Sequence, residues 1–154
     1  MTLNVSEPAD TRMISEIATY IRESRVAINA ISGGGNVGAT ILEVTAGATS
    51  LTVGSEIGSY GFEIIIISGA GLATLATILG GTAGQVKVFV FQDTNIDITD
   101  GDAKINGVFY LDQLPAGSDF DAQIDDVLAV VNVGGDGAAV YGYWKELYRT
   151  ISVK

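Results

Sequence analysis

The residues best suited to chemistry in this sequence are carboxylates, because the chain contains no Cys and no His. Without thiols or imidazoles it cannot build a Ser-His-Asp triad, a Cys nucleophile, a thiolate or imidazole metal site, or a disulfide framework. Any catalytic or metal-binding function must therefore rest on Asp, Glu and backbone oxygens.

One acidic loop has part of the spacing of a calcium site. Asp93, Asn95 and Asp97 place side-chain oxygens at positions 1, 3 and 5 of such a loop. Ile98 then stands where an EF-hand needs Gly, and Lys104 stands where it needs a bidentate Glu. The sequence is thus consistent with another kind of Ca²⁺ site assembled with neighbouring acidic residues, or with a solvated turn, which is the default interpretation.

A second acidic group consists of Asp119, Asp121, Asp125 and Asp126. Paired carboxylates can hydrolyse glycosides when a desolvated pocket raises the pKa of one of them. Spacing along a loop does not reveal such a pocket, so a solubilising turn is favoured over a polysaccharide depolymerase that uses Asp119 or Asp125. The chain is therefore predicted not to be an enzyme and to need no cofactor.

Charge and hydropathy exclude further classes of partner. The chain carries 8 Lys+Arg against 18 Asp+Glu, a net charge of −10, whereas nucleic-acid binding needs Lys and Arg to neutralise phosphates. Residues 64–85 are uncharged over a length that could span a bilayer, but Gly and Thr interrupt them and no basic or aromatic belt flanks them. We expect no nucleic acid and no membrane as partner, and two buried strands joined by a Gly turn in this segment.

The strongest helix signal covers residues 10–31, where Asp10 can cap the first turn and no Gly or Pro intervenes. Two interleaved rows of Ile with a period of seven form a heptad seam, which favours trimers when Ile occupies both positions. An amphipathic helix that packs on its own domain is the alternative. The predicted oligomer or anchor interface comprises Ile14, Ile17, Ile21, Ile28 and Ile31 on the seam, with Arg22 and Arg25 beside it.

A hinge of Gly-rich composition at 32–36 separates this arm, residues 1–31, from a body at 37–154. The body has short β-type runs, several of them apolar on both faces, and no helix pattern between them. This predicts a mainly β fold: a β-sandwich with jelly-roll-like topology, preceded by an α-helical arm and assembled as a trimer. The expected strands are 40–45, 50–53, 61–67, 72–79, 85–92, 107–114, 126–132 and 139–148, with polar loops at 93–106 and 115–125.

Aromatic residues gather near the end of the chain at Tyr141, Tyr143, Trp144 and Tyr148. An exposed row of such rings could stack on a host glycan. A closing strand would also use them in the core or in a subunit interface, and this interpretation is favoured because exposed apolar patches are uncommon.

Three segments resemble small virion proteins of tailed bacteriophages: TYIRESRVAINAI at 19–31, GGTAGQVKVFVF at 80–91 and YWKELYRT at 143–150. In that group an IRExRxAIN helix precedes a Gly-rich hinge and a β-domain that ends in a W-x-E-L-x-R-like strand. The matching positions are Ile21, Arg22, Glu23, Arg25, Ile28 and Asn29, then Gly81, Thr82, Ala83, Gly84 and Gln85, and finally Trp144, Glu146, Leu147 and Arg149.

The resemblance implies a capsid decoration (cement) protein, a head fibre or a tail-fibre part, commonly trimeric and without cofactor. We therefore expect a homotrimer on the outer capsid surface of the virion, bound to the major capsid protein. In the leading expectation the β-domains form the trimer and residues 1–31 anchor it on capsid subunits; the arm could instead form the trimer's coiled coil. The alternative is a head-fibre or tail-fibre segment that binds a host receptor or glycan.

Overall fold

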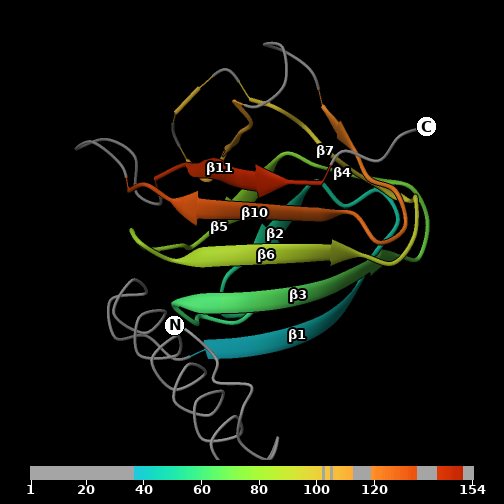
Figure 1. Ribbon diagram of the computed structural model, residues 1–154, viewed down its shortest axis with the longest axis horizontal. Coiled ribbons are helices and arrows are strands. Elements are labelled where there is room, and N and C mark those ends of the chain that lie inside the picture. Colours follow the sequence, from blue (N-terminus) through green and yellow to red (C-terminus); the bar gives the residue numbers. More distant parts are fainter. Residues whose placement is uncertain (1–36, 102, 105, 113–118, 135–141, 151–154) are drawn as a thin grey trace, which may run out of the picture.

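The computed structural model describes residues 37–101, 103–104, 106–112, 119–134 and 142–150. The arm, the hinge and Tyr141 lie outside the described residues, so the predictions for them, including those for Ile14, Ile17, Ile21, Arg22, Arg25, Ile28 and Ile31, stay predictions. The described part is mainly β, as the sequence predicts (Figure 1). Its strands are β1 (Val37–Val44), β2 (Ser50–Thr52), β3 (Phe62–Gly69), β4 (Ala73–Leu75), β5 (Thr77–Leu79), β6 (Val86–Phe91), β7 (Ile96–Ile98), β8 (Phe109–Tyr110), β9 (Phe120–Asp121), β10 (Val127–Asn132) and β11 (Trp144–Arg149).

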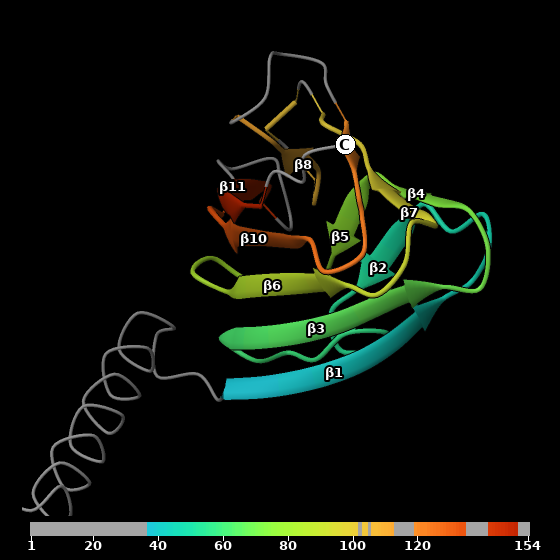
Figure 2. The same ribbon diagram turned by 45° about the vertical axis from the view of Figure 1, so that its right-hand side comes forward.

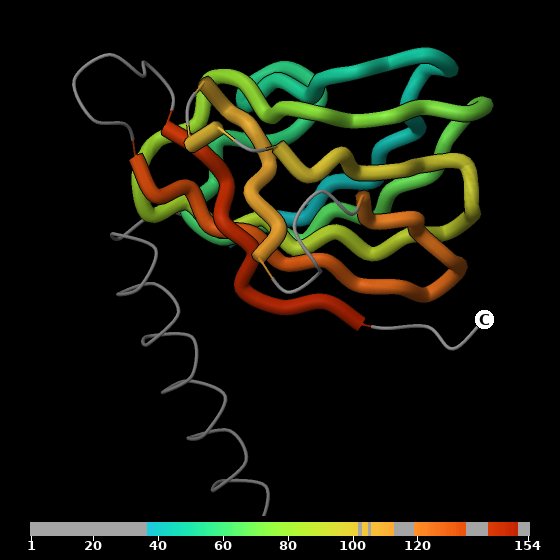
Figure 3. The backbone as a smooth tube through the Cα atoms, turned by 90° about the horizontal axis from the view of Figure 1, so that it is seen from above, coloured from blue at the N-terminus to red at the C-terminus, as the bar shows by residue number. Residues whose placement is uncertain are grey.

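The long strands β1, β3 and β6 lie side by side. Each is the front strand of one of three stacked turns of the chain, which we call coils. β1, β3 and β6 pair in parallel, with Val37 opposite Phe62 and Phe62 opposite Val86. The short strands behind them also pair in parallel, β2 with β5 and β4 with β7. Each passage from one front strand to the next therefore goes around the back of the coil, as the view along the stack shows (Figure 3). These return paths provide the long crossovers that parallel pairing requires.

The later strands of the chain run antiparallel to the strands of the third coil and cover its open edge. β9 pairs antiparallel with β7, and β10 pairs antiparallel with β6. β11 then pairs antiparallel with β10 and parallel with β8, which completes a six-stranded sheet of order β1-β3-β6-β10-β11-β8. This reversed layer satisfies the backbone groups that the third coil would otherwise leave unpaired.

The core fills the space between the six-stranded sheet and the back of the coils (Figure 2). Alternate residues of the front strands point inward, so Ile65 stacks opposite Phe89 and Ile67 opposite Phe91. Phe89 lies edge-on to Phe109, and Phe91 contacts Phe120. The core is therefore a stack of large apolar side chains, with one layer from each coil. In the expected β-sandwich it would instead lie where the inner faces of two sheets meet.

The predicted jelly-roll order is wrong for this body. Jelly rolls pair their strands antiparallel, whereas β1, β3 and β6 run parallel. The local sequence pattern does not distinguish parallel from antiparallel pairing, because a strand with two apolar faces looks the same in either arrangement. The predicted strand at 72–79 is divided at Ala76, whose N–H donates to Thr49 O on the neighbouring coil, and the predicted loops at 93–106 and 115–125 contain β7 and β9.

The uncharged segment 64–85 contributes most of β3 and all of β4 and β5, so it forms three strands in place of the expected two. Within the described ranges, no helix has the length and apolar character needed to cross a membrane. Its Gly-rich turn at 80–84 has positive φ angles at Gly80 (76°) and Gly84 (87°), which L side chains rarely adopt. The turn between β5 and β6 thus requires glycine at these two positions.

Candidate functional site

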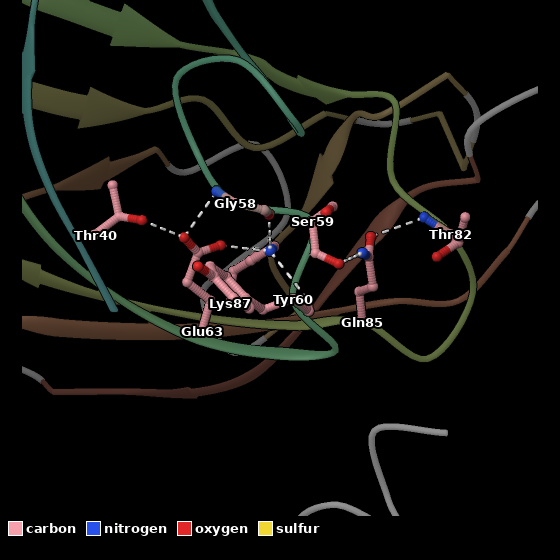
Figure 4. Close-up of polar contacts among 8 residues, drawn as sticks. All are labelled: Thr40, Gly58, Ser59, Tyr60, Glu63, Thr82, Gln85 and Lys87. Atoms are coloured by element: carbon pink, nitrogen blue, oxygen red, sulfur yellow. Dashed lines mark hydrogen bonds and ion pairs between the residues drawn. The ribbon is translucent and has the colours of Figure 1, made fainter. Parts of the chain in front are cut away.

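A buried ion pair lies at one end of the core, under the loop that precedes β3. The parallel register puts Glu63 of β3 directly opposite Lys87 of β6, both on the inward face and both fully buried. Lys87 Nζ lies 2.5 Å from Glu63 Oε2 and also donates to the carbonyls of Gly58 (2.7 Å) and Tyr60 (3.3 Å) (Figure 4). The second carboxylate oxygen, Oε1, accepts hydrogen bonds from the N–H of Gly58, at 2.8 Å, and from the hydroxyl of Thr40.

The electrostatics of this pair are dominated by burial. Loss of solvent lowers the pKa of Lys87, while the hydrogen bond and the negative charge of Glu63 raise it and oppose the shift. All three ammonium protons have an acceptor, so the charge is compensated within the fold. The pair therefore ties the 54–60 loop to two strands, and its side chains are not offered to a ligand.

An open pocket of about 430 Å³ lies beside the pair and is lined by Thr40 and residues 54–60. The Tyr60 ring packs so closely on Gly38 and Gly58 that a Cβ at either glycine would lie within 2.3 Å of it. The charged groups beneath the pocket are bonded to one another, and the lining itself carries one acidic side chain, Glu56, which accepts a hydrogen bond from Thr52 N. The pocket contains no pair of groups arranged for acid-base catalysis.

A second buried ion pair lies on β11. A bulge places Ala129 opposite Tyr148 but Val130 opposite Glu146, so Leu147 is an extra residue and both Glu146 and Arg149 turn inward. Arg149 Nη2 lies 2.5 Å from Glu146 Oε2, and its guanidinium stacks 5.3 Å from the centre of the Phe120 ring. The ion pair lies within β11, and the stacking of Arg149 on Phe120 joins this strand to β9; both ion-pair residues belong to the segment that carries the resemblance to virion proteins.

The predicted calcium residues are used in turn formation between β6 and β7. Asp93 accepts hydrogen bonds from the N–H groups of Gly69 and Asn95, both at 2.9 Å, and the Asn95 amide donates to Gly69 O at 3.0 Å. Asp97 lies on β7, opposite Asp121. Over the residues that the structure describes, no group of three or more acidic side chains could hold a metal ion. The Ca²⁺ site stays a hypothesis without a formed ligand cluster.

The second acidic group is also dispersed among structural hydrogen bonds. Asp119 accepts from the N–H of Asp100 (3.0 Å), and Asp126 is buried and accepts from the N–H of Gln123 (2.9 Å) and the hydroxyl of Thr150 (3.1 Å). Asp125 occupies a turn position with φ of 67°. Asp119 and Asp126 thus accept hydrogen bonds that hold the local fold, and Gln123 also donates from its side-chain amide to Asp121 at 3.4 Å.

The terminal aromatic residues divide between core and surface. Trp144 is fully buried, and its indole N–H donates to Ile78 O at 3.0 Å. Tyr143 is half-buried and lies edge-on to Tyr110, 5.9 Å between ring centres. Tyr148 is exposed on β11. Of the described aromatic candidates, Trp144 is therefore unavailable for stacking on a sugar.

The largest feature that the sequence did not single out is the outward face of the six-stranded sheet, which we call the outer sheet face. Figure 1 looks onto it, with β2 and β5 behind. The registers of the sheet align three rows of apolar side chains across it. The face comprises Val37, Ala39, Ile41, Phe62, Ile64, Ile66, Val86, Val88, Val90, Val127, Ala129, Val131 and Tyr148.

Two sequence signals could have revealed these features. Glu63 and Lys87 are single charged residues in otherwise apolar runs, 24 residues apart, which is the spacing between β3 and β6. The apolar residues at both odd and even positions of the same runs indicate the outer sheet face, which was expected to be covered by a second layer. Comparisons with known proteins add no assignment: no family model, curated protein or solved structure matches the chain.

Proposed function

We propose that this chain is a non-enzymatic structural protein of a tailed-bacteriophage virion, a trimeric decoration (cement) protein that binds and stabilises the outer capsid surface. Its partners in this proposal are two further copies of itself and the major capsid protein. Residues 1–31 anchor the trimer on the capsid or form a coiled coil within it.

The observation that carries the proposal is the outer sheet face. Its side chains at Val37, Ile41, Ile64 and Tyr148 are exposed, and a monomeric soluble protein rarely exposes a large contiguous apolar patch unless it binds something. A structural virion protein needs durable self-association, and an apolar sheet supplies it without a cofactor. The net charge of −10 opposes contact with packaged DNA and so favours a location outside the shell.

A head-fibre or tail-fibre segment is the second candidate, favoured by the exposed ring of Tyr148 at the margin of the outer sheet face. Such a ring can stack on a sugar. A glycan array probed with the full chain and with Tyr148→Ala tests this candidate, which predicts a signal that the variant loses.

Immuno-electron microscopy of gradient-purified particles, from cells that carry the gene, tests the proposal itself. Antibodies raised against the full chain should label the capsid surface, and mass spectrometry should find the protein in the same fractions. Gold confined to the tail would favour the fibre candidate. Particles that lack the protein altogether would overturn a virion role.

A further inference from the structure

We infer that copies of this chain bind one another through the outer sheet face, so that the apolar rows of one copy pack against those of the next. This inference rests on the proposed trimeric assembly and names the surface that forms it. The sequence left two expectations open, a trimer formed by the β-body or by the arm, and this inference assigns it to one face of the body.

The exposure of the face is highest at its two sides. On β1, Ile41 is 85% exposed and Val37 is 51% exposed, and on β11 Tyr148 is 58% exposed. Ile64, in the middle of the face, is 41% exposed, because neighbouring side chains on the same rows cover part of its surface. No other strand among the described residues lies across these rows. Apart from Val86, which is buried, the residues of this face are partly or fully exposed and lie outside the main core cluster, so covering them with another surface would add to stability.

The width of the face indicates a sheet as its occupant. The strands from β1 to β11 span about 19 Å, because adjacent strands lie about 4.8 Å apart. A helix built from residues 10–31 would be about 10–12 Å across, so one arm covers roughly half of this width. In a trimer the outer sheet faces of three copies turn toward a common axis, and the sheets of the two neighbouring copies together cover all five strands. Copies of the same face therefore meet this requirement.

The distribution of charge supports self-association at this surface. Copies with a net charge of −10 repel one another wherever their acidic loops meet. At the outward positions of β1, β3, β6, β10 and β11, the charged side chains are Glu43 and Lys145, and both lie at the margin: Glu43 is beyond the apolar rows, opposite Ser68, and Lys145 ends one row, opposite Val131. An uncharged centre with a polar rim is the usual anatomy of a protein interface.

The experiment measures the mass of the full chain by size-exclusion chromatography with light scattering. The unaltered chain should elute as a trimer of three times 16.0 kDa, about 48 kDa. The double variant Ile41→Asp/Ile64→Asp should elute as a monomer. The matched control is Leu72→Asp/Ile124→Asp, which adds the same two charges at positions that are 76% and 60% exposed, between β3 and β4 and between β9 and β10, and should remain a trimer.

Cross-linking provides a second readout that does not depend on the double variant folding. Because the chain has no Cys, one introduced Cys is its only thiol. With a short bis-maleimide, at least one of Val37→Cys, Ile41→Cys and Ile64→Cys should give covalent dimers, and Leu72→Cys should give none. Absence of cross-links from all three face positions would overturn the inference.

Two further outcomes separate this inference from the proposed function. If Ile21→Asp abolishes the trimer and the aspartates on the outer sheet face do not, the arm forms the trimer and the inference is wrong, while capsid labelling remains possible. If the face forms the trimer but purified particles lack the protein, the inference holds and the virion role fails. A monomer at every concentration contradicts the inference directly.

Discussion

The inner and outer faces of the six-stranded sheet are both apolar, yet only the inner one is covered by the described fold. Ile65 and Ile64 are adjacent on β3, and they are 0% and 41% exposed, respectively. The inner face also contains Glu63 and Lys87, a charged pair, whereas the rows of the outer sheet face carry a charge only at their margin, on Lys145 opposite Val131. The usual relation between charge and exposure is thus reversed in this sheet.

The difference separates the requirements of folding from those of assembly. The inner face tolerates a charged pair because each ion has a partner and additional hydrogen bonds. Folding of one copy does not require an apolar outer face, since antiparallel and edge-exposed sheets commonly have polar residues there. The apolar character of the outer sheet face therefore fits the inference that further copies cover it.

The largest effect is expected from breaking the buried pair. Lys87→Met leaves the Glu63 carboxylate buried without its cation and should lower the free energy of unfolding by about 3–5 kcal/mol, measured by urea denaturation. Glu63→Gln/Lys87→Met removes both charges and should recover at least half of the loss. If the single variant were as stable as the unaltered protein, the pair would not tie the 54–60 loop to the sheet.

A smaller effect should distinguish the two faces at neighbouring positions. Ile65→Ala creates a cavity in the core and should cost about 2–5 kcal/mol at any protein concentration. Ile64→Ala should cost less than about 1 kcal/mol in a dilute monomer, and more as concentration rises if copies cover it, because assembly stabilises the folded state by mass action. Thermal melts of both variants at several concentrations measure this. Equal, concentration-independent losses would remove the distinction between the faces.

The smallest effect is a dependence on pH. Burial lowers the pKa of Lys87 from its ordinary value of 10.5, so the unfolded chain binds more protons than the folded one between the two pKa values. The contribution of Lys87 is therefore unfavourable below the lowered pKa, and stability should rise with pH across the alkaline window that ends near 10.5. The difference in melting temperature between the unaltered protein and Glu63→Gln/Lys87→Met should grow in this window. A difference that shrinks would contradict the sign.

Much of the local structure could be predicted from the sequence. Alternation and apolar runs located β1, β3, β6 and β10 to within a few residues, and glycine predicted the turn before β6. The short strands β7 and β9 were missed, because three or two residues such as Ile96–Ile98 carry too little pattern to separate them from a polar loop. Their strand geometry comes from pairing with a neighbouring coil.

The candidate sites were less predictable than the strands. Acidic residues such as Asp93 and Asp126 were interpreted as possible ligands or catalysts, and each accepts backbone hydrogen bonds in a turn. Trp144 could have been surface or core, and only its contact with Ile78 O on β5 decides for the core. In both cases the deciding partner is remote in the sequence or a backbone group, which residue type does not reveal.

Composition and local pattern were enough to establish that this chain is mainly β, that it has no thiol or imidazole chemistry, and that several of its strands are apolar on both faces. The tertiary structure decided that β1, β3 and β6 are parallel, that Glu63 meets Lys87, and that one apolar face is left outward. The physical reason is that strand formation follows from local side-chain pattern, whereas parallel and antiparallel pairing use nearly the same local backbone geometry. The direction of pairing is therefore fixed by contacts between residues about 24 positions or more apart in the chain.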